Sequence, residues 1–310
     1  MSMMRSVLLT GAESVWLRER AMRTPFVRRS VSKFMPGETM DEALTASRRL
    51  EAEQGTGTIL THLGENLTSL AEAEEVTRHY LELLERVQRE RLNVQVSVKL
   101  TQLGLDHGTE ECYRNLATLV ERADALGNIV WIDMESTKYV DRTLALFRRV
   151  RERSARTGVC LQSYLRRTAS DLEGLLPLAP AIRLVKGAYR EPPELAFPKK
   201  VDVDENYFRL ATRFFDPGVP AGTFLGIGTH DGSLVQRIRD VAAARGAAPG
   251  SYEFEMLYGI QRPLQARLVR DRVPLRVLIS YGEFWFPWYM RRLAERPANV
   301  LFVAKSLFAR

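Results

Sequence analysis

Val94-Gln-Val-Ser-Val98 and Ile129-Val-Trp-Ile-Asp133 are two short runs of apolar and β-branched residues in a chain of 310 residues. Between them, from Cys112 to Leu126, apolar residues recur at the spacing of an amphipathic helix. A strand, a helix and a second strand in this order predict two parallel strands joined by a right-handed crossover.

The same alternation continues along most of the chain. Strand-like runs also occur at Thr58 to His62, Val159 to Ser163, Ile182 to Lys186, Thr223 to Ile227, Tyr252 to Met256 and Leu275 to Ile279. Further amphipathic stretches are Leu67 to Arg91, Val140 to Arg156, Asn206 to Phe215, Ser233 to Arg245 and Gln261 to Arg270. The strand-like runs number eight, which is the count that closes into a barrel. We therefore predict an α/β protein with a (βα)8 TIM barrel over residues 56–310.

An open, doubly wound sheet is the competing fold for this alternation, and it commonly carries a glycine-rich phosphate loop. The nearest candidate, Gly226-Ile-Gly-Thr-His-Asp-Gly232, is one residue too long for that pattern. Residues 1–55 contain no strand-like run, so we expect a helical extension there. One helix is predicted over Ser6 to Met22 and another over Thr39 to Gln54, where Thr39 and Glu42 match a capping box.

The composition is that of an ordinary globular protein, with 45% hydrophobic and 27% charged residues. The net charge is +7, but Glu is interspersed with Lys and Arg, which favours solvated helix faces over a nucleic-acid interface. An anionic small substrate or an acidic membrane surface stays open as a partner. Only Cys112 and Cys160 are present, and no apolar run reaches the roughly 20 residues of a membrane span. We expect a cytoplasmic protein.

Polar side chains follow nearly every predicted strand, at the end where a parallel barrel holds its active site. These residues are His62, Glu65, Lys99, Asp133, Gln162, Tyr164, Lys186, His230, Asp231, Glu255 and Tyr281. Lys99 and Asp133 end neighbouring strands at similar depth, and we expect them to form an ion pair facing the barrel mouth. The alternative is a salt bridge with a structural role only.

Arg183 and Lys186 are predicted to project from opposite faces of one strand. Gly187 and Ala188, which follow, would let the backbone approach a bulky ligand. This arrangement suits an anion or a cofactor, and two solvated charges at the rim are the alternative. His230 is a lone strand-end histidine, which is more often a hydrogen-bonded structural residue. The four histidines lack metal-ligand spacing, so no metal site is predicted.

The aromatic stretch Phe284-Trp-Phe-Pro-Trp-Tyr289 precedes Arg291, Arg292 and Glu295. A helix with aromatic residues nearly all round must be buried on more than one side. Two adjacent arginines beneath such a wall suit charge-assisted recognition of a carboxylate. An ion pair between Arg291 and Glu295 within one helix is the alternative.

Six motifs in order resemble those of the proline dehydrogenases, in particular the short, monofunctional bacterial type. They are Ser97-Val-Lys-Leu100, Ile132-Asp-Met-Glu135, Arg183-Leu-Val-Lys-Gly-Ala-Tyr189, Gly228-Thr-His-Asp231, Phe254-Glu-Met-Leu-Tyr-Gly259 and Tyr289-Met-Arg-Arg-Leu-Ala-Glu-Arg-Pro297. The resemblance runs from about Thr56 to Leu307.

The resemblance implies a distorted (βα)8 barrel with a final helix over its mouth and FAD at the carboxyl ends of the strands. The implied reaction is oxidation of L-proline to Δ1-pyrroline-5-carboxylate by hydride transfer from proline C5 to flavin N5. The implied electron acceptor is a quinone, which would bring the protein into peripheral contact with the inner face of a membrane.

The resemblance also implies roles for individual residues. Asp133 and Arg183 would be catalytic, Arg183 near the flavin N5 and Asp133 by orienting Lys99 and the paired arginines. Proline would be bound by Lys99, Tyr189, Leu257, Leu278, Arg291 and Arg292. FAD would be bound by Met134, Gln162, Arg183, Val185, Lys186, Gly187, Ala188, Lys200, Thr229, His230, Asp231 and Glu295. Glu65 would pair with Arg292 and gate the site.

The chain departs from the family pattern at three positions. Leu278 stands where a tyrosine is common, which removes a hydroxyl from the substrate side and puts selectivity against hydroxyproline in doubt. Tyr281 could replace it only if the strand register shifts. Glu255 stands where a glutamine is expected, so its charge needs a partner. Arg190 replaces an aromatic residue and could still stack on a ring of the cofactor.

Two other functions are compatible with the residues alone. One is a lyase of the class I aldolase type, in which Lys99 or Lys186 forms a Schiff base with a carbonyl substrate. A charged partner such as Asp133 raises a lysine pKa and works against that role. The other is a basic binding module without catalysis, for nucleic acid or membrane.

Overall fold

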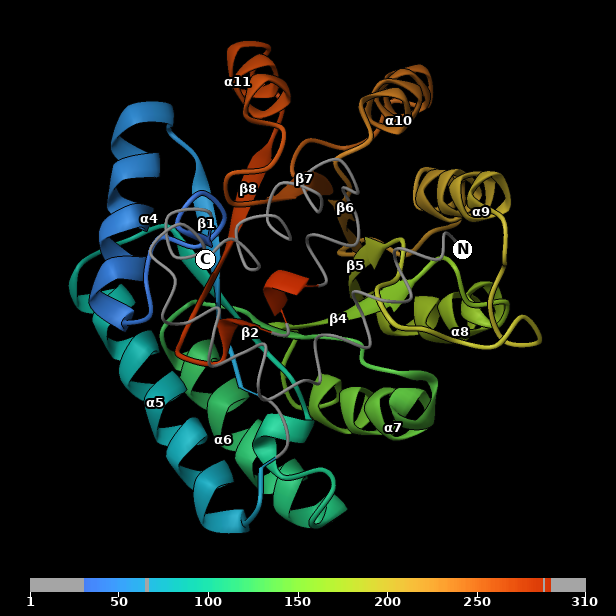
Figure 1. Cartoon of the computed structure of the whole chain (residues 1–310). Helices are drawn as coiled ribbons and strands as arrows, with labels where there is room; N and C mark the ends of the chain where they lie inside the picture. The colour runs from blue at the N-terminus through green and yellow to red at the C-terminus, as the bar shows by residue number, and fades with distance from the viewer. Residues whose placement is uncertain (1–30, 65–66, 287, 291–310) are drawn as a thin grey trace, which may run out of the picture.

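The computed structural model describes residues 31–64, 67–286 and 288–290 (Figure 1). Eight parallel strands form a closed barrel in chain order, so the predicted barrel is confirmed and the open sheet is wrong. The strands are β1 (Gly57–His62), β2 (Val94–Val98), β3 (Val130–Ile132), β4 (Thr157–Gln162), β5 (Ala181–Val185), β6 (Phe224–Gly228), β7 (Tyr252–Leu257) and β8 (Leu275–Tyr281).

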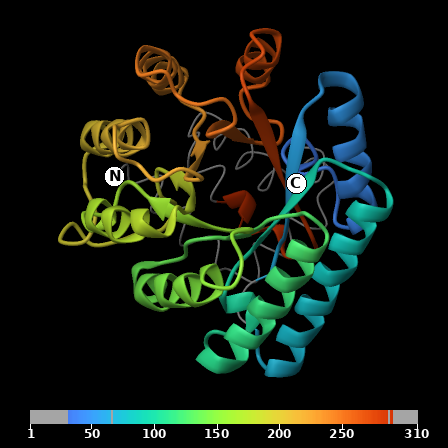
Figure 2. The same ribbon diagram turned by 180° about the vertical axis from the view of Figure 1, so that it is seen from behind.

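A ring of helices surrounds the barrel, as Figures 1 and 2 show from its two sides. Their bounds are α4 (Met40–Gln54), α5 (Leu70–Arg89), α6 (Thr109–Ala125), α7 (Val140–Arg151), α8 (Thr168–Leu175), α9 (Lys200–Arg213), α10 (Gly232–Ala244) and α11 (Arg262–Arg270). Short 3₁₀ turns lie at Thr101–Leu103, Thr137–Tyr139 and Leu176–Leu178. Within the described ranges, no helix combines the length and apolar character that crossing a membrane requires.

The helix α9 begins six residues earlier than its apolar spacing predicts, at Lys200 rather than Asn206. Its first turn lies at the rim of the barrel, where Val201 is 61% exposed. Val203 in this first part of the helix is only partly buried against the core, whereas Tyr207 is fully buried, so the apolar periodicity becomes clear only from there on.

The helix α4 carries the predicted capping box. Glu42 N donates to Thr39 Oγ1 at 3.3 Å, and Thr39 N donates to Glu42 Oε2 at 3.0 Å. The helix packs against β1 and β8, and Thr58 Oγ1 of β1 donates to Ser47 Oγ at 2.9 Å. It therefore fills the place in the ring between α11 and α5 (Figures 1 and 2). The boundary at residue 55 stays a prediction, and the helix expected over Ser6 to Met22 lies outside the described residues.

Side chains alternate along each strand between the barrel interior and the helices. The outward side chains form the main core, which includes Leu60, Val96, Ile132 and Ile279. Inside the barrel, Ile59, Trp131 and Ala181 form a smaller apolar layer. Polar and charged inward side chains occupy the space on either side of this layer, and those toward the carboxyl ends of the strands line a cavity.

Candidate active site

A cavity of about 1240 Å³ opens at the carboxyl ends of the strands. Each of the eight strands, or the loop that follows it, contributes to its wall. The sequence-predicted site residues that line it are Lys99, Asp133, Met134, Gln162, Arg183, Val185, Lys186, Gly187, Ala188, Tyr189, Lys200, Thr229, His230, Asp231, Leu257 and Leu278. Glu65, Arg291, Arg292 and Glu295 lie outside the described residues. Tertiary structure thus brings the described candidates together around one space.

Arg183 lies at the floor of this cavity and is almost completely buried. Its Nε donates to Glu255 Oε2 at 2.5 Å, and its Nη1 donates to Asp133 Oδ1 at 3.1 Å and to Ser97 Oγ at 3.0 Å. The guanidinium carbon lies 4.6 Å from the ring centroid of Trp131, a cation–π distance. Burial disfavours the positive charge of Arg183 and acts to lower its pKa. The negative charges of Glu255 and Asp133 together have the larger effect, so the pKa of Arg183 is raised.

Glu255 has the partner that the sequence left undefined, because Arg183 pairs with it. Burial raises the pKa of Glu255 to about 7, although the positive charge of Arg183 acts in the opposite direction. Glu255 Oε1 and Arg183 Nη2 have no hydrogen-bond partner within the described part of the chain. Buried polar atoms without partners are rare, and they are found at sites that bind a ligand.

The predicted ion pair between Lys99 and Asp133 is wrong. Among the described residues, the ion pairs include none that joins these two, and Asp133 instead accepts hydrogen bonds from Ser97 Oγ at 2.9 Å and from Arg183. The prediction considered only that the two residues end neighbouring strands. It could not include Arg183 of β5, which reaches across the barrel interior to Asp133. Lys99 keeps its place in the cavity wall.

Lys186 directly follows β5, and its side chain reaches α9 and the start of α10 rather than the carboxylates that contact Arg183. Its Nζ lies 2.6 Å from Asp204 of α9 and 3.0 Å from Asp231, which caps α10. Lys200 joins the same cluster through Asp204 and Asp231. Lys186 thus contacts two carboxylates, and Lys200 contacts the same two.

Two residues at strand ends in the cavity wall, His230 and Gly187, have structural roles. His230 Nε2 accepts a hydrogen bond from Leu257 N at 2.9 Å and so ties the end of β6 to the end of β7, as expected for a hydrogen-bonded histidine. Gly187 has a φ of +117°, and a Cβ atom there would lie 2.2 Å from the ring of Tyr164. Only glycine fits this position, because the ring of Tyr164 occupies the space that a Cβ atom would need.

The register of β8 excludes Tyr281 from the cavity. His62 of β1 pairs with Tyr281, whose side chain is fully buried on the helix side, where its hydroxyl lies 2.7 Å from His79 Nε2. Leu278 and Ser280 line the cavity instead. Thr61, Cys160 and Ser280 also line the cavity, although they were not predicted from the sequence. On β1 the predicted residue, His62, has the opposite parity to Thr61, whereas Cys160 shares strand parity with Gln162 and Ser280 shares it with Leu278. For these last two residues, that parity was the available signal.

The aromatic stretch after β8 is buried as predicted. Trp285, Phe286, Trp288 and Tyr289 are all buried, whereas Phe284 is 58% exposed, and Trp288 lines the cavity. The predicted carboxylate-binding arginines follow directly, but they lie outside the described residues.

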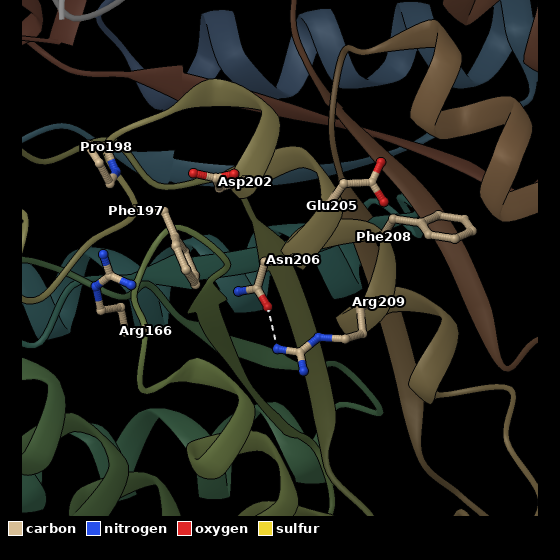
Figure 3. A pocket seen from close by; sticks show the side chains of 8 residues that line it. All are labelled: Arg166, Phe197, Pro198, Asp202, Glu205, Asn206, Phe208 and Arg209. Carbon is tan, nitrogen blue, oxygen red and sulfur yellow. Dashed lines mark hydrogen bonds between the residues drawn. The ribbon is translucent and has the colours of Figure 1, made fainter.

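A second hollow of about 570 Å³ lies beside the mouth, along the outer side of α9 (Figure 3). Phe197 and Pro198 belong to both hollows. Charges of both signs surround the second one, and Arg209 Nη2 donates to Asn206 Oδ1 at 2.7 Å. None of the sequence-predicted site residues lines it.

A closed α/β barrel with a large charged cavity at the carboxyl ends of its strands has the architecture of a barrel enzyme. The family model for proline dehydrogenase matches residues 43–305. The chain belongs to the proline dehydrogenase family, as its motifs predicted, and the family assignment does not favour the alternative lyase.

Two relatives match nearly their whole length. Proline dehydrogenase 2 of Bacillus subtilis is 35% identical over 280 residues, which are 90% of this chain and 91% of that protein. The proline dehydrogenase of Deinococcus radiodurans is 34% identical over 308 residues, which are 98% of this chain and 97% of that protein.

A solved structure shows the same fold. The crystal structure of proline utilization A from Bdellovibrio bacteriovorus, inactivated by N-propargylglycine, has a TM-score of 0.79 at 24% identity. The match covers 86% of this chain and 32% of that one, so this chain spans about a third of the length of that protein.

Proposed function

We propose that the chain oxidises L-proline to Δ1-pyrroline-5-carboxylate with bound FAD and passes the electrons to a quinone. The observation that carries this proposal is the convergence of the described candidate residues on one cavity, around the buried guanidinium of Arg183. The names of the relatives, which identify them as proline dehydrogenases, support proline as the substrate.

The cavity fits a flavin dinucleotide in size and in chemistry. A volume of about 1240 Å³ exceeds what a small amino acid alone needs. Arg183 Nη2 is a buried donor without a partner among the described residues, and Gly187 and Tyr164 both line the cavity. The residues that would hold FAD are Met134, Gln162, Arg183, Val185, Lys186, Gly187, Ala188, Lys200, Thr229, His230 and Asp231, with Glu295.

FAD, when bound, supplies through its N5 atom the acceptor for a hydride from C5 of proline. The task of the chain is to hold the substrate ring in near-attack contact, which requires no protein nucleophile. Lys99, Arg291 and Arg292 would hold the carboxylate, while Tyr189, Leu257 and Leu278 would pack around the ring. Positive charge in this wall disfavours an ammonium, so the substrate amine is kept neutral, as hydride donation requires. Glu65 and Arg292 would close the site as a gate.

The direct test is anaerobic addition of L-proline to the purified protein, which we expect to be yellow and to lose its flavin absorbance. A quinone added afterwards should restore the absorbance. A colourless protein that borohydride links to a carbonyl substrate through Lys99 or Lys186 would contradict the proposal and support the lyase. Binding of the protein to anionic vesicles, compared with its binding to neutral vesicles, tests peripheral membrane association.

Leu278 makes substrate selectivity a separate part of the proposal. The side chain lines the cavity where the family commonly has a tyrosine, and Tyr281 does not replace it. We expect hydroxyproline to be discriminated less strongly than it would be by a Leu278→Tyr variant. The ratio of kcat/KM for the two substrates in both proteins measures this, and an unchanged ratio would remove Leu278 from the specificity argument.

A further inference from the structure

Glu255 and Arg183 meet across an intervening strand, and Gly226 makes the contact possible. Arg183 lies on β5 and Glu255 on β7, while Gly226 of β6 lies beside Arg183 in the strand register. A Cβ atom at Gly226 would lie 2.1 Å from Glu255 Oε1. Any larger residue would displace the carboxylate from the guanidinium, so the glycine provides the space that this ion pair occupies.

The cluster around this pair is closely packed and has unbalanced charge. The side chains of Arg183 and Glu255 each keep only 3% of their surface exposed. Arg183 contacts both Glu255 and Asp133, so one positive charge faces two negative charges when both carboxyl groups are ionised. Protonation of Glu255 leaves one charge of each sign, which costs less in a buried site.

Ionisable groups reach Glu255 from most of the elements that pack against it, whereas the β6 residues beside the pair, Gly226 and Gly228, have no ionisable side chain. The groups are Arg183 of β5, Glu253 of β7, Arg276 of β8, Cys160 of β4, Tyr207 of α9 and, through Arg183, Asp133 after β3. Burial outweighs the cations among them and raises the pKa of Glu255 to about 7. The carboxyl group therefore changes its charge close to neutral pH.

We propose that Glu255 is a positioning residue that anchors Arg183 at the cavity floor and, by its own charge, sets how readily the bound flavin is reduced. This inference rests on the proposed FAD-dependent function. Reduction adds negative charge to the flavin, and the positive charge of Arg183 stabilises that state. Ionised Glu255 cancels part of this stabilisation, whereas protonated Glu255 does not.

The test compares three holoenzymes: wild type, Glu255→Gln and, as a matched control, Glu253→Gln. The measurement is the ratio of reduced to oxidised flavin at equilibrium with a redox dye, between about pH 6 and pH 8. Glutamine keeps the size of the side chain and can still accept a hydrogen bond from Arg183, but it carries no charge. Glu253 lies two residues earlier on β7 and pairs with Arg276, away from the cavity.

Glu255→Gln should match wild type near pH 6 and exceed its reduced-to-oxidised ratio on the order of tenfold near pH 8. Glu253→Gln should keep the pH-dependent change of wild type but shift it toward lower pH, because the charge of Glu253 helps to raise the pKa of Glu255. Near pH 8, where Glu255 is ionised in both proteins, its ratio should match that of wild type. Reduced-to-oxidised ratios of wild type and Glu255→Gln that change in parallel with pH would overturn the inference. An increase near pH 8 in Glu253→Gln as large as that in Glu255→Gln would also overturn it.

A second measurement needs no variant, in case Glu255→Gln does not fold. Reduction of the wild-type flavin near pH 7 should draw a proton onto Glu255, which adds a carboxylic acid band to the reduced-minus-oxidised infrared spectrum. A spectrum without this band would also overturn the inference. Failure of the proposed function is distinguishable, because wild-type protein would then hold no flavin or show no reduction by L-proline.

Discussion

Two glutamates on the inner face of β7 each pair with an arginine, yet the two pairs differ in burial and in hydrogen bonding. Glu253 Oε1 lies 2.9 Å from Arg276 Nε, and both side chains are 12% exposed. Arg276 also donates to Asn93 Oδ1 at 2.9 Å. Glu255 and Arg183 are buried more deeply, and each keeps one polar atom without a partner within the described part of the chain.

The two ion pairs differ because they lie toward opposite ends of the barrel. The pair of Glu253 and Arg276 lies near the amino ends of the strands, where loops supply the remaining hydrogen bonds, as Asn93 does. The pair of Glu255 and Arg183 lies toward the carboxyl ends, which hold the active site in barrels of this kind. We interpret the first pair as stabilising the barrel and the second as keeping a buried donor available for a ligand.

The largest expected effect comes from removing the guanidinium at the cavity floor. Arg183→Met should lower kcat/KM for proline by at least about 100-fold, because it removes fixed positive charge where negative charge develops. Arg183→Lys keeps the charge without the fork and should lose less. Anaerobic stopped-flow reduction of the flavin measures both. Retention of wild-type rates in Arg183→Met, at full flavin content, would contradict the functional interpretation.

Replacing the arginine of the other pair should affect stability much more than activity. Arg276→Met leaves Glu253 without its ion-pair partner in a mostly buried position, and we expect a loss of about 2 kcal/mol in the free energy of unfolding. Urea denaturation measures this loss, and steady-state turnover of the folded protein serves as the control. A fall in kcat comparable with that of Arg183→Met would show that the two ends of the barrel are not functionally distinct.

A half-buried pair of histidines beside the mouth, His62 and His79, should make stability depend on pH. Burial lowers the pKa of His62 from 6.5 to about 4, and burial also lowers the pKa of His79. A lowered histidine pKa means that the unfolded chain binds protons first, so these residues destabilise the fold as pH falls below about 6.5.

The free energy of unfolding should fall in both proteins when the pH is lowered from about 7 to about 5. We expect the fall to be about 1 kcal/mol smaller in His62→Leu than in wild type. Urea denaturation at the two pH values measures the difference. His107→Leu, at an exposed position, is the matched control and should behave as wild type. Equal pH dependence in wild type and His62→Leu would show that His62 carries no such effect.

The smallest effect is expected for an ion pair at the surface. Arg237 donates to both oxygens of Glu205, at 2.8 and 3.2 Å, but the side chains are 42% and 57% exposed. Glu205→Gln should therefore change the free energy of unfolding by less than about 0.5 kcal/mol. A change as large as that of Arg276→Met would mean that burial is not what separates the ion pairs of this barrel.

The strand runs and helices were predictable because apolar periodicity is a local property of the chain. The capping box of Thr39 and Glu42 was predictable for the same reason, since its partners are three residues apart. The place of α4 between α11 and α5 was not, because it depends on how the last strand closes against the first. The ion pair expected between Lys99 and Asp133 failed because strand order does not reveal how far an arginine reaches.

By itself, the sequence determined the strand-helix alternation, the polar residues at the strand ends and the ordered motifs of the family. Those features depend on residue type and on spacing along the chain. Tertiary structure alone decided which charges meet, because Arg183, Gly226, Glu255 and Asp133 come together only when the barrel closes. Their pairing depends on distances across the barrel, where one missing side chain at Gly226 determines whether a carboxylate reaches a guanidinium.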